Sequence, residues 1–239
     1  MLELYHGGPA GHSASVLITL AEKGIEYVSH RLDIASFEQH GEAFRSLNPA
    51  GQVPVLVADG QPLTETFLIL LYLDERYLGV PLGGADARDR YAVQKWGKYV
   101  ETHIAPNLAI ARWARFGTRV NDEIRKGLTR LPPERETLWR SALDGFSEEA
   151  VETARAALAK AASRLAEDLA DGNWLAGADY TLADIAAYPH LTQFAALDIE
   201  VPGDVEGWLD RIAERPAVRA VGNQAQIAAT MGPERGRWG

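Results

Sequence analysis

The residues best suited to chemistry lie in the segment Asn48–Leu56 and in the short sequence Thr64-Glu65-Thr66 that follows it. Val53 precedes Pro54 in a strand-like run, and proline cannot donate a hydrogen bond to a sheet ladder. A cis peptide bond at a sheet edge would accommodate the proline and turn the Val53 backbone outward, where it can pair with an extended peptide. An ordinary trans proline at an edge is the alternative.

Glu65 and Thr66 stand where the next helix is expected to begin. The free N–H groups and the positive end of the helix dipole favour an anion at that point. The Glu65 carboxylate can hold an ammonium group at the same time. An amine and a carboxylate on one carbon, as at the end of a peptide, match this pair. The alternative is that the two residues only cap the helix.

The elements that must position these residues follow a mixed order. Turn signals and hydrophobic periodicity predict strands at residues 2–5, 27–32, 53–57 and 61–64, and helices at 13–23 and 65–77. Ser13 and Ser15 are the expected caps of the first helix. This order indicates a four-stranded sheet with helices packed against it.

Strand signals fade after the Gly- and Pro-rich residues 79–85. We therefore predict an α/β domain over residues 1–78, a linker over 79–85 and an all-α domain over 86–239. Within the last, residues 86–116 are helical in pattern, residues 117–147 indicate an interrupted helix or a loop insertion, and a cleaner helix begins at Ser147. Thr181 and Asp184 have capping-box spacing, and a last helix is expected to end near Arg215-Pro216.

Composition excludes several function classes. The chain has 239 residues, a net charge of −9 and no cysteine. An acidic surface repels nucleic acid, and any thiol chemistry must use a thiol carried by the ligand. The N-terminus shows no signal-peptide pattern and the longest apolar run, 67–73, is too short to span a bilayer, so we expect a cytoplasmic protein. His103 and His190 lack the partners of a metal motif, so no metal is expected.

These motifs resemble a known family. "NPAGQVPVL" followed by "LTET", and "YTLADIAAYP" at residues 180–189, are similar to the two signature segments of cytosolic glutathione transferases. The resemblance implies a thioredoxin-like domain followed by a helical domain, with glutathione as cofactor. It further implies that the Val53 backbone pairs with the cysteinyl part of glutathione and that Glu65 and Thr66 hold the γ-glutamyl end. Gln52 flanks that site, and Gln39 or His40 meets the glycine carboxylate.

The loop from His6 to Ser15 is where the resemblance places thiol activation. A free thiol has a pKa of about 8.5, so a hydroxyl donor and a helix N-terminus are needed to favour the thiolate. Ser13 is the first candidate, with His12 beside it, and backbone amides alone are the remaining possibility. Tyr5 is a weaker candidate. The serine of zeta- and delta-like members falls at Ala10, which has no donor.

The stretches at residues 37–56 and 131–149 resemble one branch in particular, the bacterial β-etherases of lignin degradation. In that branch a serine occupies the place of Ser13, and glutathione displaces a phenol from a β-aryl ether ketone. The resemblance thus implies an aromatic acceptor between the two domains, and its candidate contacts are Tyr99, Trp113, Phe116 and Trp139. It also implies a homodimer. A glutathione-dependent disulfide reductase and a non-catalytic binding protein of the same fold remain alternatives.

Overall fold

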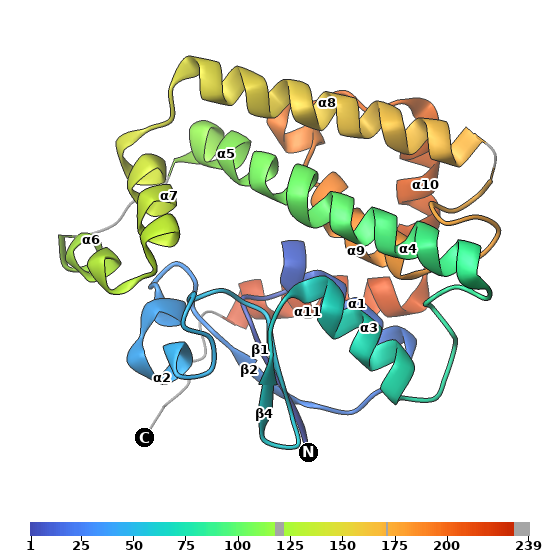
Figure 1. Ribbon diagram of the computed structural model, residues 1–239, viewed down its shortest axis with the longest axis horizontal. Helices are drawn as coiled ribbons and strands as arrows, with labels where there is room; N and C mark the ends of the chain where they lie inside the picture. The colour runs from blue at the N-terminus through green and yellow to red at the C-terminus, as the bar shows by residue number, and fades with distance from the viewer. Residues whose placement is uncertain (118–121, 171, 232–239) are drawn as a thin grey trace.

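A computed structural model describes residues 1–117, 122–170 and 172–231 (Figure 1). Its first part is a four-stranded sheet in the order β2-β1-β3-β4, built from β1 (Leu2–His6), β2 (Val28–Arg31), β3 (Val55–Ala58) and β4 (Gln61–Leu63). β1 runs parallel to β2 and antiparallel to β3, and β3 forms a hairpin with β4. The predicted mixed sheet is confirmed.

Alternating residues of the strands divide the sheet into two buried faces. Leu4 and Leu56 pack with α1 (Gly11–Glu22) and α3 (Thr66–Arg76) in the main core. Val55 and Val57 point to the other face, where they pack with Phe44 of the short helix α2 (Glu42–Arg45). This period of two is what a strand buried on both sides requires.

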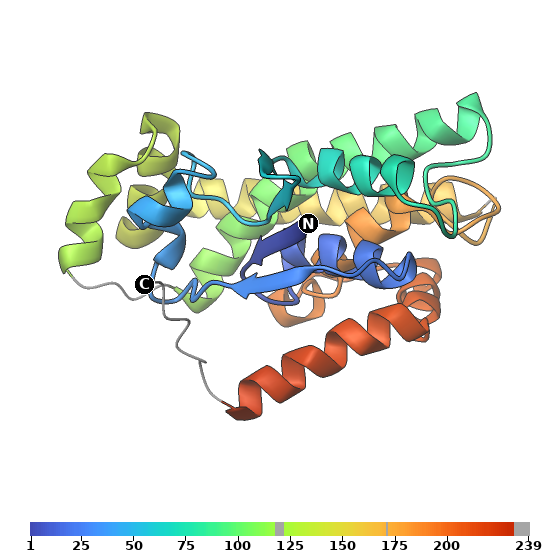
Figure 2. The same cartoon turned by 90° about the horizontal axis from the view of Figure 1, so that it is seen from below.

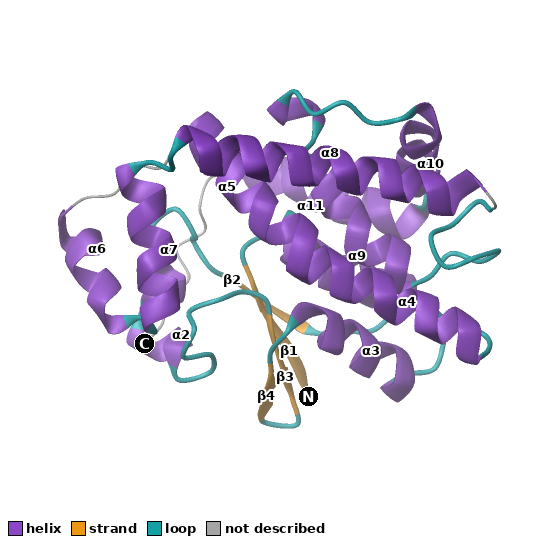
Figure 3. Ribbon diagram, turned by 45° about the horizontal axis from the view of Figure 1, so that its top comes forward, coloured by secondary structure: helices purple, strands orange, loops and turns teal. Residues whose placement is uncertain are grey.

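The second part is helical, as expected (Figure 3). Its elements are α4 (Ala87–Tyr99), the π-helical segment η2 (Val100–Ile104), α5 (Ala105–Phe116), α6 (Asp122–Gly127), the 3₁₀ turn η3 (Leu128–Arg130), α7 (Pro133–Asp144), α8 (Glu148–Ala170), α9 (Leu182–Leu191), the 3₁₀ turn η4 (Ala195–Leu197), α10 (Gly203–Ala213) and α11 (Pro216–Met231). Among the described residues, no helix has the length and apolar character needed to cross a bilayer.

α9 lies at the centre of the molecule and contacts both α1 and α4. Its N-terminus carries the predicted capping box, in which the Thr181 N–H donates to Asp184 Oδ2 at 2.9 Å and Thr181 Oγ1 accepts from the start of the helix. One continuous core runs from Leu4 through α9 to Leu165 of α8. The boundary at residues 79–85 is not marked by a break in this core and stays a prediction.

The polar stretch after α5 forms a separate unit. α6, η3 and α7 stand apart from the main helices and lie beside α2 (Figures 1 and 3). Leu128, Leu131 and Trp139 of this unit pack on Phe37, which precedes the 3₁₀ turn η1 (Glu38–His40). The expected insertion is therefore helical where it is described, and it packs both on Phe37 of the sheet-containing part and on Trp113 of α5. Residues 118–121 lie outside the described residues.

Three expectations at element ends were wrong. Ala10, not a serine, is the N-cap of α1, and no side chain caps that helix. β3 begins at Val55, so Pro54 precedes the strand instead of interrupting it, because its missing N–H cannot join the ladder. Pro216 does not end the helical part: it starts α11, which packs on α1 and extends along one side of the molecule (Figure 2). Proline is well suited to the first turn of a helix.

Candidate active site

The turn before β3 is fixed by Asn48. Its side chain donates to the Gln52 carbonyl at 2.8 Å and accepts from the Ala50 N–H at 3.1 Å. The Val53–Pro54 peptide bond is cis, as predicted. Gln52 is exposed and Val53 is half-buried, so both can reach a ligand on the surface of the sheet part.

Glu65 lies immediately before α3 in a conformation with φ 64° and ψ 101°. Non-glycine residues rarely adopt a positive φ, and such strain is concentrated at ligand sites. Glu65 is exposed, while Thr66 is the first residue of the helix. The Phe67 N–H beside them donates to Glu101 Oε1 at 2.9 Å. Glu101 belongs to η2, and no pattern in the sequence connects it with α3.

The Ser13 side chain is hydrogen-bonded to the backbone of the loop between β1 and α1. The Gly7 N–H donates to Ser13 Oγ at 3.2 Å, and the Gly8 N–H donates to His6 Nδ1 at 3.1 Å. Ser13 is buried, but its O–H hydrogen is still available to a partner. A Cβ added at Gly7 would lie 3.4 Å from Val53 Cγ2, so this loop and the cis-proline turn are in direct contact.

The start of α1 lies at the boundary with the helical part. Because no side chain caps this helix, the backbone N–H groups of its first turn are free to meet an anion. The His12 ring packs edge-on against His190 of α9, with ring centroids 4.7 Å apart. Burial lowers the pKa of His12 to about 4. His12 is therefore neutral at pH 7 and can act as a hydrogen-bond donor but not as a cation.

A small cavity of about 10 Å³ lies at the same boundary, with His12, Ser15, Thr66 and Glu101 among its lining residues. A space of this size holds roughly one water molecule. Ser15 is fully buried and its Oγ has no hydrogen-bond partner in the described part of the chain. Ser15 thus lies inside α1 and faces the interior between the two parts.

Gln39 and His40 come together with the insertion. Gln39 is buried, and the His40 ring lies 5.3 Å from Phe37 and 5.5 Å from Trp139, measured between ring centroids. Burial lowers the pKa of His40 to about 4, and the positive charges of two arginines add to the effect. The His40 ring therefore packs among aromatic side chains and is not surrounded by solvent.

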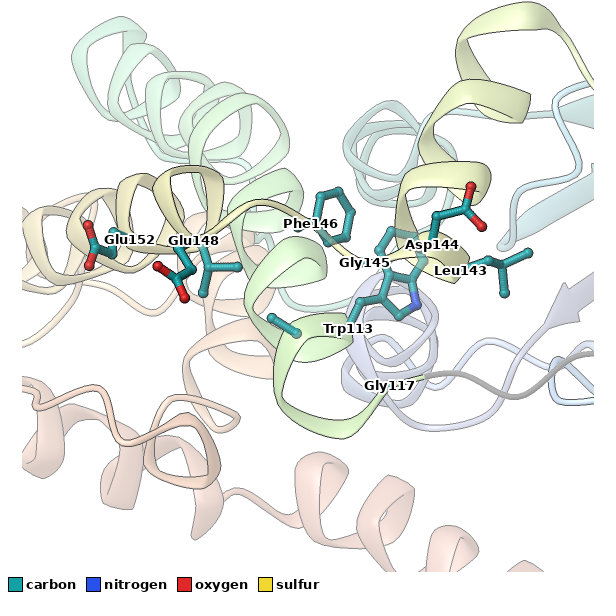
Figure 4. A pocket seen from close by; sticks show the side chains of 11 residues that line it. Trp113, Gly117, Leu143, Asp144, Gly145, Phe146, Glu148 and Glu152 are labelled. Atoms are coloured by element: carbon teal, nitrogen blue, oxygen red, sulfur yellow. The ribbon is translucent and has the colours of Figure 1, made fainter.

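The predicted acceptor residues do not form one group. Trp113 packs on Trp139 with centroids 5.0 Å apart and stacks on Phe146 at 6.0 Å. Trp113 and Phe146 line a cavity of about 580 Å³ (Figure 4). Phe116 is exposed at the end of α5, and Tyr99 lies elsewhere, stacked on His103.

All residues that line this cavity belong to the helical part, so it does not lie between the two domains as expected. Three carboxylates surround it. Asp144 of α7, whose carboxylate accepts from Arg125 Nη1 at 2.8 Å, and Glu148 and Glu152 of α8 are among its lining residues (Figure 4). Phe146 was not among the predicted contacts, although it lies within residues 131–149, whose resemblance to β-etherases implied an aromatic acceptor.

A mixed four-stranded sheet with a cis-proline turn beside a free helix N-terminus, followed by a helical bundle, defines a thioredoxin-like domain joined to an all-α domain. The family model described as "Glutathione S-transferase, N-terminal domain" matches residues 12–76, and "Glutathione S-transferase, C-terminal domain" matches residues 125–216. The chain belongs to the glutathione S-transferase family, whose cofactor is glutathione.

Individual relatives cover nearly all of the chain. Protein LigF of Sphingobium sp. (strain NBRC 103272 / SYK-6) is 32% identical, with 91% of each chain covered. Glutathione S-transferase GstA of Escherichia coli O157:H7 is 28% identical, over 88% of this chain and 92% of that protein. The crystal structure of the beta-etherase LigF superposes with a TM-score of 0.85 over 93% of this chain and 99% of that structure.

Proposed function

We propose that this protein is a glutathione-dependent β-etherase that cleaves β-aryl ethers of the kind found in lignin. The observation that carries the proposal is the likeness to the beta-etherase LigF, which extends over 93% of this chain. We include in the proposal a cytoplasmic location and a homodimeric state.

The residues present fit glutathione on structural grounds. The strained, exposed Glu65 and the start of α3 suit an amino-acid end, and the turn around the cis peptide bond leaves Val53 accessible from the active loop. In this assignment Glu65 and Thr66 hold the γ-glutamyl group, and the Val53 backbone pairs with the cysteinyl residue. Gln52, Gln39 and His40 lie on the glycine side.

Glutathione supplies the thiolate nucleophile, which forms a carbon–sulfur bond next to the ketone while the aryloxide leaves. The protein's task is to stabilise that thiolate. We assign this to the Ser13 O–H, which is free to donate while Oγ accepts from Gly7, and to the N–H groups of the first turn of α1. Neutral His12 contributes through its backbone N–H or its ring.

The aromatic acceptor is assigned to the cavity beside Trp113, where Phe146 provides a second aromatic face. The Trp139 ring packs against Trp113, and Phe116 at the exposed end of α5 is a further contact in this proposal. Tyr99 remains a weaker candidate because its ring is engaged with His103.

The test is turnover of racemic β-aryl ether ketones with glutathione, followed by chromatography of the released phenol and the glutathione thioether. We expect equal amounts of the two products and no phenol release without glutathione. A disulfide and a chlorinated nitroarene serve as alternative substrates. Turnover confined to the disulfide would replace the proposal with a disulfide reductase, and glutathione binding without any turnover would indicate a binding protein.

A further inference from the structure

Two arginines from different parts of the chain converge on His40. Arg45 is on α2, and Arg135 is in the first turn of α7, on the insertion. Both act on the pKa of His40, which places their positive charges near its ring. Trp139 is four residues after Arg135 on the same face of α7, and its ring contacts that of His40. We call Arg45 and Arg135, together with the neutral ring of His40, the cationic cluster; its positive charges are those of the two arginines.

The cationic cluster lacks the anion that its charges require. Arg45 Nε, Arg135 Nε and His40 Nε2 are buried without a hydrogen-bond partner in the described part of the chain. Neither arginine forms an ion pair with a described carboxylate; Glu134, next to Arg135, acts on it only at longer range. Buried charged groups are normally paired, because an unpaired one loses its hydration without compensation.

A second observation supports a ligand at this position. Trp139 is 8% exposed, and its indole Nε1, which can only donate, has no described partner either. Unpartnered donors on α2 and α7 therefore lie near the His40 ring. The chain has a net charge of −9, so acidic residues are available to pair with these donors. A shortage of carboxylates therefore does not explain why the donors are unpaired.

The cationic cluster lies one residue from the proposed glutathione site. Gly51 packs so closely on it that an added Cβ would lie 2.8 Å from His40 Cδ2 and 3.4 Å from Leu131 Cδ2, next to α7. Gln52 and Val53 follow directly. The turn that carries the peptide-binding backbone, the η1 turn and the insertion thus meet at Gly51, which has a φ of +63°.

We propose that Arg135 of the insertion, together with Arg45, binds the glycine carboxylate of glutathione. The helical insertion then forms part of the cofactor site, and α7 closes over the glycine end of the tripeptide. Guanidinium groups are suited to this because they bind carboxylates through two parallel hydrogen bonds. The inference deepens the proposed function by assigning a binding role to residues outside the sheet part.

The experiment measures affinity by calorimetry for two ligands, glutathione and γ-glutamylcysteine, which lacks the glycine. The Arg135→Met variant keeps an apolar stem but removes the charge. We expect it to weaken glutathione binding by about 10- to 100-fold, the range of a charge-assisted hydrogen bond, and to leave γ-glutamylcysteine binding within about twofold. Arg135→Lys should restore part of the loss.

The matched control is Arg140→Met, also on α7, where the arginine is exposed and paired with Glu136. It should change neither affinity. Equal losses for both ligands in Arg135→Met would show a structural role and overturn the proposal. So would a wild-type protein that binds the two ligands equally well. No electrophile is used, so a failure here is distinguishable from a failure of the β-etherase proposal.

Discussion

Asp184 is fully buried and the residues of the cationic cluster are half-buried, and the hydrogen bonding of the two differs. Asp184 has no exposed surface and accepts hydrogen bonds from the Leu175 N–H, the Thr181 N–H and hydroxyl, and Trp208 Nε1, at 2.8–3.2 Å. The cationic cluster has three buried nitrogens without a described partner. A fully satisfied network specifies structure, whereas an unsatisfied one needs a group from outside the chain.

The difference also explains how each region can respond to a ligand. Around Asp184 every donor is already engaged, so glutathione has nothing to add there. At the cationic cluster an incoming carboxylate compensates charges whose desolvation the fold has already incurred. The predictions below test this contrast, beginning with the largest effect.

Replacing Asp184 by alanine should destabilise the protein by about 3 kcal/mol or more. A helix cap alone is worth about 1 kcal/mol, but here the change also leaves several buried donors unpaired. Urea unfolding followed by circular dichroism measures the loss. Glutathione affinity should be unchanged at a temperature where the variant is folded. A loss near 1 kcal/mol would mean that the network acts only as a cap.

The cationic cluster should make stability depend on pH. Burial and the charges of Arg45 and Arg135 lower the pKa of His40 from 6.5 to about 4 in the fold, so the unfolded chain binds more protons between these values. The contribution of His40 is therefore complete above pH 6.5 and is lost as the pH falls toward about 4. The slope per histidine is about 1.4 kcal/mol per pH unit.

Urea unfolding at several pH values checks this sign. His40→Gln should reduce the slope of unfolding free energy against pH by about one proton. Saturating glutathione should raise the pKa of His40 and so reduce the same slope. Burial instead raises the pKa of Asp184, so the folded protein binds a proton there more readily than the unfolded chain does. The contribution of Asp184 to stability is therefore present at low pH and is lost as the pH rises. An unchanged slope in His40→Gln would contradict the prediction.

Ser13→Ala should raise the pKa of the bound glutathione thiol by about one unit and slow turnover about tenfold, since the N–H groups of α1 remain. Thiolate absorbance against pH measures the shift, with His12→Ala as the comparison. In its hydrogen bonding Ser13 is intermediate between Asp184 and the cationic cluster, because its oxygen accepts one hydrogen bond while its proton is available. If only His12→Ala changes the thiol pKa and the rate, the role belongs to His12.

The smallest effect on stability is expected at Glu65. Glu65→Gly relieves the strain of φ 64° and should make the protein about 1 kcal/mol more stable than Glu65→Ala, in which the strain persists. Both variants lose the carboxylate and should bind glutathione more weakly, by roughly 1.5–3 kcal/mol. Thermal unfolding and calorimetry separate the two effects. Equal stability of the two variants would show that the backbone is not strained.

Sequence alone predicted the features that depend on neighbouring residues. The capping box of Thr181 and Asp184, the cis bond at Val53 and the presence of a four-stranded sheet all follow from short patterns. It did not predict α11, because Pro216 suits the end of one helix as well as the start of the next.

Contacts between distant segments could not be predicted from the sequence, for a different reason. The pairing of Glu101 with the start of α3 joins residues 34 positions apart, and Arg135 reaches His40 across the insertion. Neither residue type is unusual on a helix, so its role appears only when the packing is known. Trp139 was selected for its ring, whereas its unpartnered N–H is what distinguishes it in the structure.

The π-helical segment η2 lets one continuous helix hold an extra residue without changing its facing. α4, η2 and α5 are continuous from Ala87 to Phe116, and a π-helical turn contains about one residue more than an α-helical turn for nearly the same rotation. Deleting a single residue from η2 would therefore restore regular α-helix and keep Trp113 facing Phe146 and Trp139. The same deletion inside α5, before Trp113, would turn that ring by about 100°. The chain therefore tolerates a change of length in η2 far better than in the regular helix that follows it.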